Sequence, residues 1–175
     1  MNINKYLTVD QTLELAIQNH QKGSLEDAIK LYQKVIAMNQ NYPKAYDNLG
    51  TIFAGLEEYQ KAKECFEKAI DVNPKYISAF NNLGNILHKL GESEKAINSF
   101  KKVIEIDPNF KTAYYNLGLI FLDELGKAQK ARAINCYENA IKIDPNYIDA
   151  YWNLYNTSSD IDEALSILEK ILLID

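Results

Sequence analysis

Apolar and small residues recur along this chain with the spacing expected of helices that are buried on one side. In residues 77–90 they stand three or four positions apart, at Ala79, Phe80, Leu83, Gly84, Leu87 and Leu90, which places them on one helical face. A second stripe follows each such segment, an Ala with an aromatic residue or Leu four positions later. It occurs five times, at Ala28–Tyr32, Ala62–Phe66, Ala96–Phe100, Ala133–Tyr137 and Ala164–Leu168. The two stripes together predict about ten helices in five antiparallel pairs.

A six-residue segment returns at a fixed interval. Ala79–Gly84 is preceded by Ala45–Gly50 and followed by Ala113–Gly118, each 34 positions away, and a fourth copy, Ala150–Tyr155, ends in Tyr instead of Gly. A fixed period of this size indicates a stack of repeats. After a short lead-in at 1–7, the predicted repeats are 9–42, 43–76, 77–110, 111–147 and 148–175. The fourth is lengthened around 123–130, and the first helix of the fifth is shortened and ends near Thr157.

Turn residues stand between the predicted helices. Asn73-Pro74, Asp107-Pro108 and Asp144-Pro145 close three repeats, because Pro does not continue the preceding helix. The helices of a pair are separated by Gly23, Gly91 and Gly126, with Glu57 at this place in the second repeat. Three further glycines, Gly50, Gly84 and Gly118, lie inside helical stripes, where Gly costs about 1 kcal/mol relative to Ala. They predict close packing against a neighbouring helix, a place that Ala16 takes in the first repeat.

The full pattern resembles the tetratricopeptide repeat (TPR). It consists of an aromatic residue, Leu-Gly three positions on, Ala-x-x-x-aromatic in the second helix, and Asp/Asn-Pro at the end, and it covers residues 9–175. The resemblance implies an all-α fold, a right-handed α-solenoid of five helix-turn-helix units that forms a single domain over 1–175. First helices would line the concave wall and second helices the outer wall. The first repeat departs from the pattern at Gln11-Thr12 and at Asn19.

The TPR resemblance also implies which side chains face the concave groove. From the inward places of the first helices, the candidate peptide-binding residues are Lys44, Asp47, Asn48, Asn81, Asn82, Asn85, His88, Tyr115, Asn116, Trp152 and Asn153. The same places also give Asp10, Leu13, Glu14, Ile17, His20, Gln21, Thr51, Ala54, Gly55, Ser78, Lys89, Thr112, Leu119, Leu122, Asp123, Asp149 and Asn156. Tyr115 and Trp152 would form an aromatic patch that anchors a ligand, or would pack on the next repeat.

An Asn precedes Leu in four repeats, as Asn48, Asn82, Asn116 and Asn153. An Asn side chain has donors and an acceptor, as a peptide group does, so a row of them could hold an extended peptide by its backbone. The series looks like the asparagine ladder of O-linked N-acetylglucosamine transferases. The alternative is that these residues form hydrogen bonds within or between helices. A two-carboxylate clamp like that of co-chaperones is disfavoured, because its cations are missing and Asp149 stands where one is needed.

Composition and charge restrict the function further. The 175 residues are 47% hydrophobic and 25% charged, with a dispersed net charge of −5, which disfavours nucleic acid as a partner. There is no apolar run of about 18 residues to span a membrane and no signal-like start. Cys65 and Cys136 stand two repeats apart, which predicts free thiols in a reducing cytoplasm.

The sequence contains no motif of a catalytic, cofactor or metal site. It lacks a Gly-rich phosphate loop, a His-x-x-x-His pair and a nucleophile elbow, and His20 and His88 are two repeats apart. We therefore expect a non-enzymatic scaffold that binds a protein or peptide in the groove. Two alternatives stay open. The opening 16–32 is similar to bacterial TPR proteins that continue into glycosyltransferase, sulfotransferase or methyltransferase domains. The uncapped repeat end at Ile174-Asp175 would also allow homo-oligomers.

Overall fold

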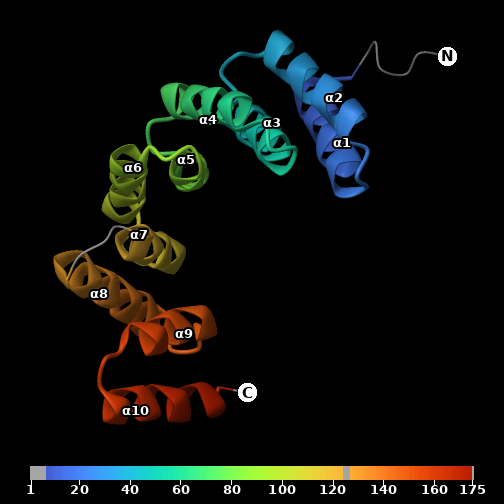
Figure 1. Cartoon of the computed structure of the whole chain (residues 1–175). Helices are drawn as coiled ribbons and strands as arrows, with labels where there is room; N and C mark the ends of the chain where they lie inside the picture. Colours follow the sequence, from blue (N-terminus) through green and yellow to red (C-terminus); the bar gives the residue numbers. More distant parts are fainter. Residues whose placement is uncertain (1–6, 124–126, 175) are drawn as a thin grey trace. The chain divides into compact units, whose positions relative to one another are not determined.

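The computed structural model describes residues 7–123 and 127–174, and within these ranges it contains ten α-helices and no β-strand. The helices are α1 (Val9–Gln21), α2 (Leu25–Met38), α3 (Pro43–Gly55), α4 (Tyr59–Val72), α5 (Ile77–Lys89), α6 (Ser93–Ile106), α7 (Lys111–Asp123), α8 (Lys127–Ile143), α9 (Ile148–Thr157) and α10 (Ile161–Leu172). These bounds confirm the predicted all-α fold of helix pairs (Figure 1). Most of the predicted lead-in, the predicted turn residue Gly126, and Asp175 lie outside the described residues.

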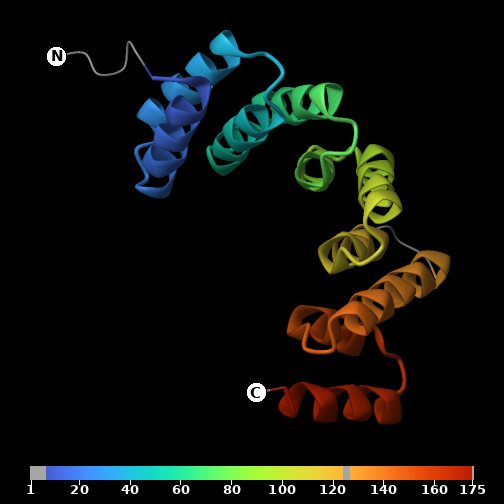
Figure 2. The same ribbon diagram turned by 180° about the vertical axis from the view of Figure 1, so that it is seen from behind.

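The chain forms two compact units, an N-terminal unit that ends at Glu92 and a C-terminal unit that begins at Ser93. The N-terminal unit holds α1 to α5 and the C-terminal unit α6 to α10. Within each unit every helix contacts the next one along the chain, as both views of the ribbon show (Figure 1, Figure 2). In the N-terminal unit the first helices also contact one another, α1 with α3 and α3 with α5. The prediction of one domain over the whole chain stays a prediction.

Three residues that separate the two helices of a pair have the left-handed backbone conformation that their place in the repeat predicts. Gly23 and Gly91 have φ of 79° and 75°, and Glu57 has φ of 60°, although a non-Gly residue rarely adopts this left-handed conformation. Helix α8 has 17 residues whereas α6 has 14, which accounts for the lengthened fourth repeat. Helix α9 has 10 residues and ends at Thr157, so the shortened first helix of the fifth repeat is confirmed.

Glycines inside the first helices allow a buried aromatic ring to lie against the backbone. A Cβ at Gly50 would stand 2.7 Å from Cε1 of Phe66, and a Cβ at Gly118 would stand 2.5 Å from Cε1 of Tyr137. The two rings are 1% and 0% exposed, so neither has free space to move into. The close packing predicted for Gly50 and Gly118 is therefore confirmed. This packing joins the two helices of a pair and fixes the rotation of the first helix about its axis.

Candidate peptide-binding face

The predicted face residues of the N-terminal unit lie on α3 and α5, two first helices that contact each other directly. Lys44 is exposed, whereas Asp47 is only 5% exposed. The others are half-buried: Asn48, Asn81, Asn82, Asn85 and His88. Asp47 is therefore a buried residue at the contact between α3 and α5. The half-buried side chains form the polar surface beside it.

Asp47 connects α3 to α5 through its carboxylate. Its Oδ1 accepts a hydrogen bond from Nδ2 of Asn82 at 3.0 Å, and its Oδ2 accepts one from Oγ of Ser78 at 2.7 Å. The side chain of Tyr76, just before α5, also interacts with this carboxylate. Hydrogen bonds that an ionised carboxylate accepts are among the stronger ones in proteins. We conclude that Asn82 uses an N–H group of its side-chain amide to connect the two helices.

Burial raises the pKa of the Asp47 carboxyl above its ordinary value of 3.8, and the hydrogen bonds from Ser78, Asn82 and Tyr76 lower it by less. Desolvation disfavours the charged form, while donors aimed at the carboxylate favour it. The net shift means that ionised Asp47 is retained at some expense of stability. The carboxylate is held between α3 and α5 by Ser78, Asn82 and Tyr76.

The C-terminal unit has the same connection with a different acceptor. Nδ2 of Asn153 on α9 donates to the phenolic oxygen of Tyr115 on α7 at 3.1 Å, and also to the backbone oxygen of Asp149 at 3.0 Å. Tyr115 is the fifth residue of α7 as Asp47 is the fifth of α3, and Asn153 is the sixth of α9 as Asn82 is the sixth of α5. At these two places the Asn series bonds between first helices. Ligand contact by the series stays a prediction.

Tyr115 lies in a cluster of aromatic rings. Its centroid is 6.0 Å from that of Tyr137 and 5.3 Å from that of Tyr147. The ammonium of Lys111 lies 4.8 Å from the centroid of the Tyr147 ring and forms an ion pair with Asp144. This pair lowers the pKa of the Asp144 carboxyl. The cluster therefore fixes the Tyr115 ring from several sides.

Trp152 occupies a different environment from Tyr115. It is 43% exposed, and its ring makes an edge contact with Tyr155, with centroids 5.8 Å apart. Asn116 is half-buried on α7. Among the ring pairs found in the described residues, Tyr115 and Trp152 do not contact each other. An exposed indole of this kind remains available to a ligand.

Asn48 is the first member of the Asn series. The first helix that precedes it is α1, whose fifth residue is the apolar Leu13 and not an acceptor such as Asp47. The side chain of Asn48 instead lies near the Tyr32 hydroxyl. Burial raises the pKa of Tyr32, and Asn48 lowers that pKa by a smaller amount. No hydrogen bond of ordinary geometry reaches this hydroxyl. Oδ1 of Asn81 is buried and has no hydrogen-bond partner among the described residues. The series therefore does not serve one purpose in all repeats.

A small pocket lies between α3 and α5 on the predicted face. It has a volume of about 180 Å³ and is lined by Thr51, Ala54, Phe66, Asn82, Asn85, Ile86 and Lys89. Five of the lining residues, Thr51, Ala54, Asn82, Asn85 and Lys89, stand at inward places that the TPR resemblance implies. Phe66 and Ile86 form an apolar floor, and the amide and ammonium groups stand at the rim. The pocket can take one medium-sized aliphatic side chain with polar groups beside it.

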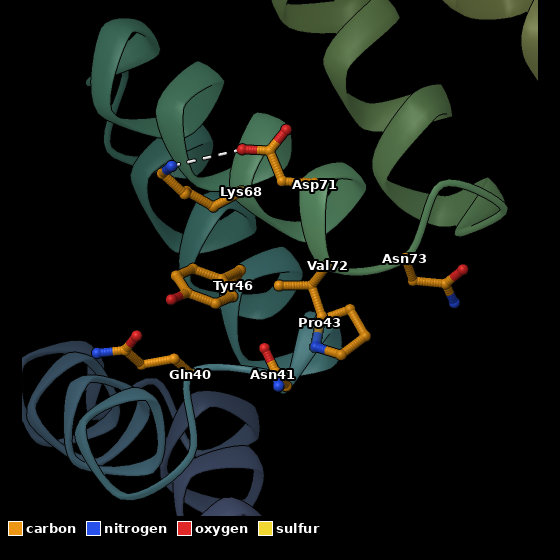
Figure 3. A pocket seen from close by; sticks show the side chains of 8 residues that line it. All are labelled: Gln40, Asn41, Pro43, Tyr46, Lys68, Asp71, Val72 and Asn73. Atoms are coloured by element: carbon orange, nitrogen blue, oxygen red, sulfur yellow. Dashed lines mark hydrogen bonds and ion pairs between the residues drawn. The ribbon is translucent and has the colours of Figure 1, made fainter.

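A larger pocket in the N-terminal unit lies away from the predicted face. Figure 3 shows its lining: Gln40, Asn41, Pro43, Tyr46, Lys68, Asp71, Val72 and Asn73, with the Lys68–Asp71 ion pair at its edge. Its volume is about 860 Å³. A second pocket at the equivalent place in the C-terminal unit includes Asn109, Tyr114 and Asn139. Because such a pocket lies beside the loop between repeats in both units, we attribute it to loop geometry.

Sequence reasoning did not include the pocket floor among the functional residues, since Phe66 and Ile86 read as core. It also missed Tyr76 and Tyr147, each the residue immediately before a first helix. A signal was present, because an aromatic residue stands at this place in four repeats, as Tyr42, Tyr76, Phe110 and Tyr147. Within the described residues there is no group of three His, Cys, Asp or Glu side chains that could hold a metal ion. No helix in the same residues is long and apolar enough to cross a bilayer.

Paired antiparallel helices of fixed period, with a glycine against the buried ring in two of the repeats, define an α-helical repeat protein. A family model described as TPR repeat matches residues 18–56, 50–91, 84–123 and 125–154, so the chain belongs to the TPR family. No curated protein matches the sequence.

Solved structures share the fold. A crystal structure of MamA is 24% identical, with a TM-score of 0.82, over 97% of this chain and 95% of MamA. YrrB, described as a TPR protein with an unusual peptide-binding site, is 23% identical, with a TM-score of 0.75, over 96% of this chain and 87% of YrrB. Pseudomonas aeruginosa PilF is 19% identical, with a TM-score of 0.83, over 95% of this chain and 76% of PilF.

Proposed function

We propose that this chain is a non-enzymatic TPR scaffold that binds an extended peptide or protein segment on the α3–α5 face of its N-terminal unit. The observation that carries the proposal is the pocket of about 180 Å³ between Ala54, Phe66 and Ile86. An apolar recess with a few convergent polar groups is the usual form of a specific binding site. That YrrB is described as having a peptide-binding site supports the same use of the fold.

The anchor of the ligand is an aliphatic side chain that enters the pocket. Phe66 is 1% exposed and Ile86 is 4% exposed, so the floor is rigid and its shape is set by the core. The amides of Asn82 and Asn85 line the pocket, and the second N–H and the oxygen of the Asn82 amide bond a peptide group of the bound ligand. Binding therefore depends on one side chain in the pocket and on backbone hydrogen bonds beside it, with little demand on the rest of the ligand sequence.

Lys89 gives the ligand a charge preference. Its ammonium is exposed at the rim and lies 5.8 Å from the centroid of the Tyr59 ring, which holds the side chain near the pocket. A carboxylate next to the aliphatic anchor is therefore favoured. The chain's net charge of −5 favours a protein ligand over nucleic acid. A cytoplasmic location is part of the same proposal.

The test uses peptides selected by the full chain from a phage-displayed library of random linear peptides. The affinity of an enriched peptide is measured by calorimetry for wild type and for Ala54→Leu, which fills the pocket. We expect about a tenfold or greater loss of affinity. The matched control is Ala37→Leu, the same change at an exposed position of α2 that does not line the pocket, and it should bind as wild type does. Equal affinity for wild type and Ala54→Leu would show that the pocket is not the site.

A second variant tests the charge preference at the rim without filling the pocket. Lys89→Gln should weaken binding of enriched peptides that carry an acidic residue beside the anchor, and the difference from wild type should shrink as salt is added. Asn82→Ala is a poor probe of binding, because it also removes a donor from the buried Asp47 carboxylate. Enriched peptides without any aliphatic residue in common would contradict the proposal.

A further inference from the structure

Three polar side chains meet between α1 and α3, at places equivalent to those that line the pocket between α3 and α5. His20 stands 34 positions before Ala54, and Tyr32 stands 34 positions before Phe66. The His20 and Tyr32 rings make an edge contact, with centroids 6.3 Å apart, and the Asn48 side chain lies near the Tyr32 hydroxyl. We define the α1–α3 polar cluster as His20, Tyr32 and Asn48.

The hydroxyl of Tyr32 is buried without a hydrogen-bond partner. The side chain is 0% exposed, and no described residue forms a hydrogen bond of ordinary geometry with its oxygen. Nearly all buried polar groups in folded proteins are paired, and one that is unpaired lowers stability. The free chain therefore keeps a hydroxyl that destabilises it, which indicates a role for this group in another state of the protein.

Packing at this place does not require a hydroxyl. Phe66 and Phe100 stand at the equivalent place of the second and third repeats, and each is 1% exposed. The hydroxyl extends the Tyr32 ring at its tip, on the side of Asn48, which is a predicted face residue of α3. The unpaired group is thus directed toward the face where we propose that the peptide binds.

We propose that the α1–α3 polar cluster is a second subsite for the peptide ligand, in which the Tyr32 hydroxyl donates a hydrogen bond to the carboxamide oxygen of an Asn or Gln side chain. This inference rests on the proposed binding to the α3–α5 face. It adds a sequence requirement to a ligand that this face alone leaves nearly unrestricted.

The side chains that cover the hydroxyl turn aside when the ligand binds. His20 and Asn48 are half-buried, so both reach the surface of the free chain. Changes of side-chain rotamer are common when a protein interface forms. The carboxamide of the ligand then takes the place beside Tyr32, and its own N–H donates to the oxygen of Asn48.

The chemistry around the cluster favours a neutral carboxamide over a carboxylate. Asp10 and Glu14 are exposed on α1, and their spacing from His20 places them on the same helical face. Their like charge repels an acidic side chain of the ligand. A carboxamide has both an acceptor and donors, which matches the hydroxyl of Tyr32 and the amide of Asn48.

The distance between the two subsites sets the spacing of the ligand motif. Helix α3 contacts both α1 and α5, and the axes of helices packed together are about 8–10 Å apart. An extended peptide advances about 3.3 Å per residue. The carboxamide residue should therefore stand about three positions from the aliphatic residue that enters the α3–α5 pocket.

The test uses Tyr32→Phe and the peptides enriched by the full chain, with affinities measured by calorimetry. We expect Tyr32→Phe to weaken binding about tenfold, because the donor to the carboxamide is lost. The matched control is Tyr137→Phe, the same change at a second hydroxyl that is buried without a partner among the described residues, and it should bind as wild type does. Urea unfolding should show both variants to be at least as stable as wild type.

A change in the peptide completes the comparison. Replacing its Asn or Gln by Ala should weaken binding to wild type about tenfold and leave binding to Tyr32→Phe nearly unchanged, because the two changes remove the same hydrogen bond. Equal losses for wild type and Tyr32→Phe would overturn the inference, since the carboxamide would then bind elsewhere. Enriched peptides that share no Asn or Gln about three positions from the anchor would also overturn it.

The result with Ala54→Leu separates this inference from the proposed function. If Ala54→Leu weakens binding and Tyr32→Phe does not, the α3–α5 pocket remains the site and the second subsite is wrong. If Ala54→Leu binds the peptides as tightly as wild type, the proposed site is wrong and the second subsite is wrong with it.

Discussion

The two units make the same connection between first helices with different chemistry. In the N-terminal unit the sixth residue of α5, Asn82, donates to the buried carboxylate of Asp47. In the C-terminal unit the sixth residue of α9, Asn153, donates to the phenolic oxygen of Tyr115. The donor and its place in the repeat are constant, whereas the acceptor is a charge in one unit and an aromatic hydroxyl in the other.

This difference indicates what the Asn series does and how the two units differ. A recurrent Asn needs only an acceptor on the preceding first helix, and the repeat supplies different ones. The carboxylate makes the N-terminal connection sensitive to pH, and it is followed by a pocket with a polar rim. The Tyr115 ring makes the C-terminal connection part of an apolar cluster with Tyr137 and Tyr147. The unit with the polar connection is the one on which we propose a peptide-binding surface.

The largest expected effect concerns the glycines beneath the buried rings. We expect Gly118→Ala to lower the free energy of unfolding by about 2–3 kcal/mol and Gly50→Ala by about 1–2 kcal/mol. A Cβ would come closer to Tyr137 than to Phe66, at 2.5 Å against 2.7 Å, and Tyr115 further restrains Tyr137. Urea unfolding followed by circular dichroism measures both, and the single Trp152 reports on the C-terminal unit.

Gly55→Ala is the matched control, because a Cβ at Gly55 in α3 meets nothing within 4 Å. It should stabilise the chain by about 0.5–1 kcal/mol through the helix propensity of Ala. A larger loss in the free energy of unfolding for Gly50→Ala than for Gly118→Ala would contradict the expectation that Tyr137 is packed more tightly than Phe66.

The next effect compares the two acceptors directly. Asp47→Ala should lower the free energy of unfolding by about 1–2 kcal/mol, because it removes the acceptor of two hydrogen bonds, from Ser78 and Asn82. Tyr115→Phe should lower it by only about 0.5–1 kcal/mol, since the ring contacts remain and Asn153 keeps its bond to the Asp149 carbonyl. Urea unfolding of both variants measures the difference. Equal losses would mean that the carboxylate connection is no stronger than the phenolic one.

A smaller effect follows from the raised pKa of Asp47. In the folded chain Asp47 holds its proton at a higher pH than in the unfolded chain, so its contribution to stability rises as pH falls toward 3.8. The free energy of unfolding of wild type minus that of Asp47→Asn should therefore increase between neutral pH and pH 3.8. Each unit of pKa difference corresponds to about 1.4 kcal/mol.

Asp144 supplies the opposite case in the other unit. Its pKa is lowered by Lys111, so the stability from this pair is present above pH 3.8 and is lost as pH falls below it. The difference between wild type and Asp144→Asn should accordingly shrink in acid. A difference for Asp47→Asn that also shrank as pH fell would contradict the assignment of a raised pKa to Asp47.

The smallest expected effect is on the two free thiols, which occupy equivalent places in the two units. Burial raises the pKa of both Cys65 and Cys136 to about 11, so little thiolate is present at neutral pH. Both should react slowly with iodoacetamide, and Cys136, which is only 8% exposed, more slowly than Cys65. Peptide mass mapping over time measures the two rates. A fast Cys136 would show that the C-terminal unit opens more readily than its packing indicates.

The sequence was sufficient to predict the helices but not the partners of the face residues. Ala four positions before an aromatic residue, and Pro after Asp or Asn, define each helix locally, and the phase of the repeat even marked Glu57 as a position of left-handed backbone. The bond from Asn82 to Asp47 depends on the distance and rotation between two helices that are about a whole repeat apart. Burial of Asp47 depends on Ser78 and Tyr76 in the same way.

The pocket shows the same limit. Thr51, Ala54 and Lys89 stand at inward places that the repeat pattern implies, but the recess forms where the small Ala54 lies beside Phe66 and Ile86. A periodic pattern predicts which residues share a face. It does not predict where two faces leave a space between them, because this depends on the volumes of all side chains at the contact.

Chemical-shift mapping of the full chain with an enriched peptide tests the central claim most directly, because it locates the ligand residue by residue. The account predicts that the largest backbone amide shifts fall on Thr51, Ala54, Asn85 and Lys89, around the pocket between α3 and α5. Shifts confined instead to Gln40, Asn41, Tyr46 and Lys68, which line the larger pocket of Figure 3, would contradict it.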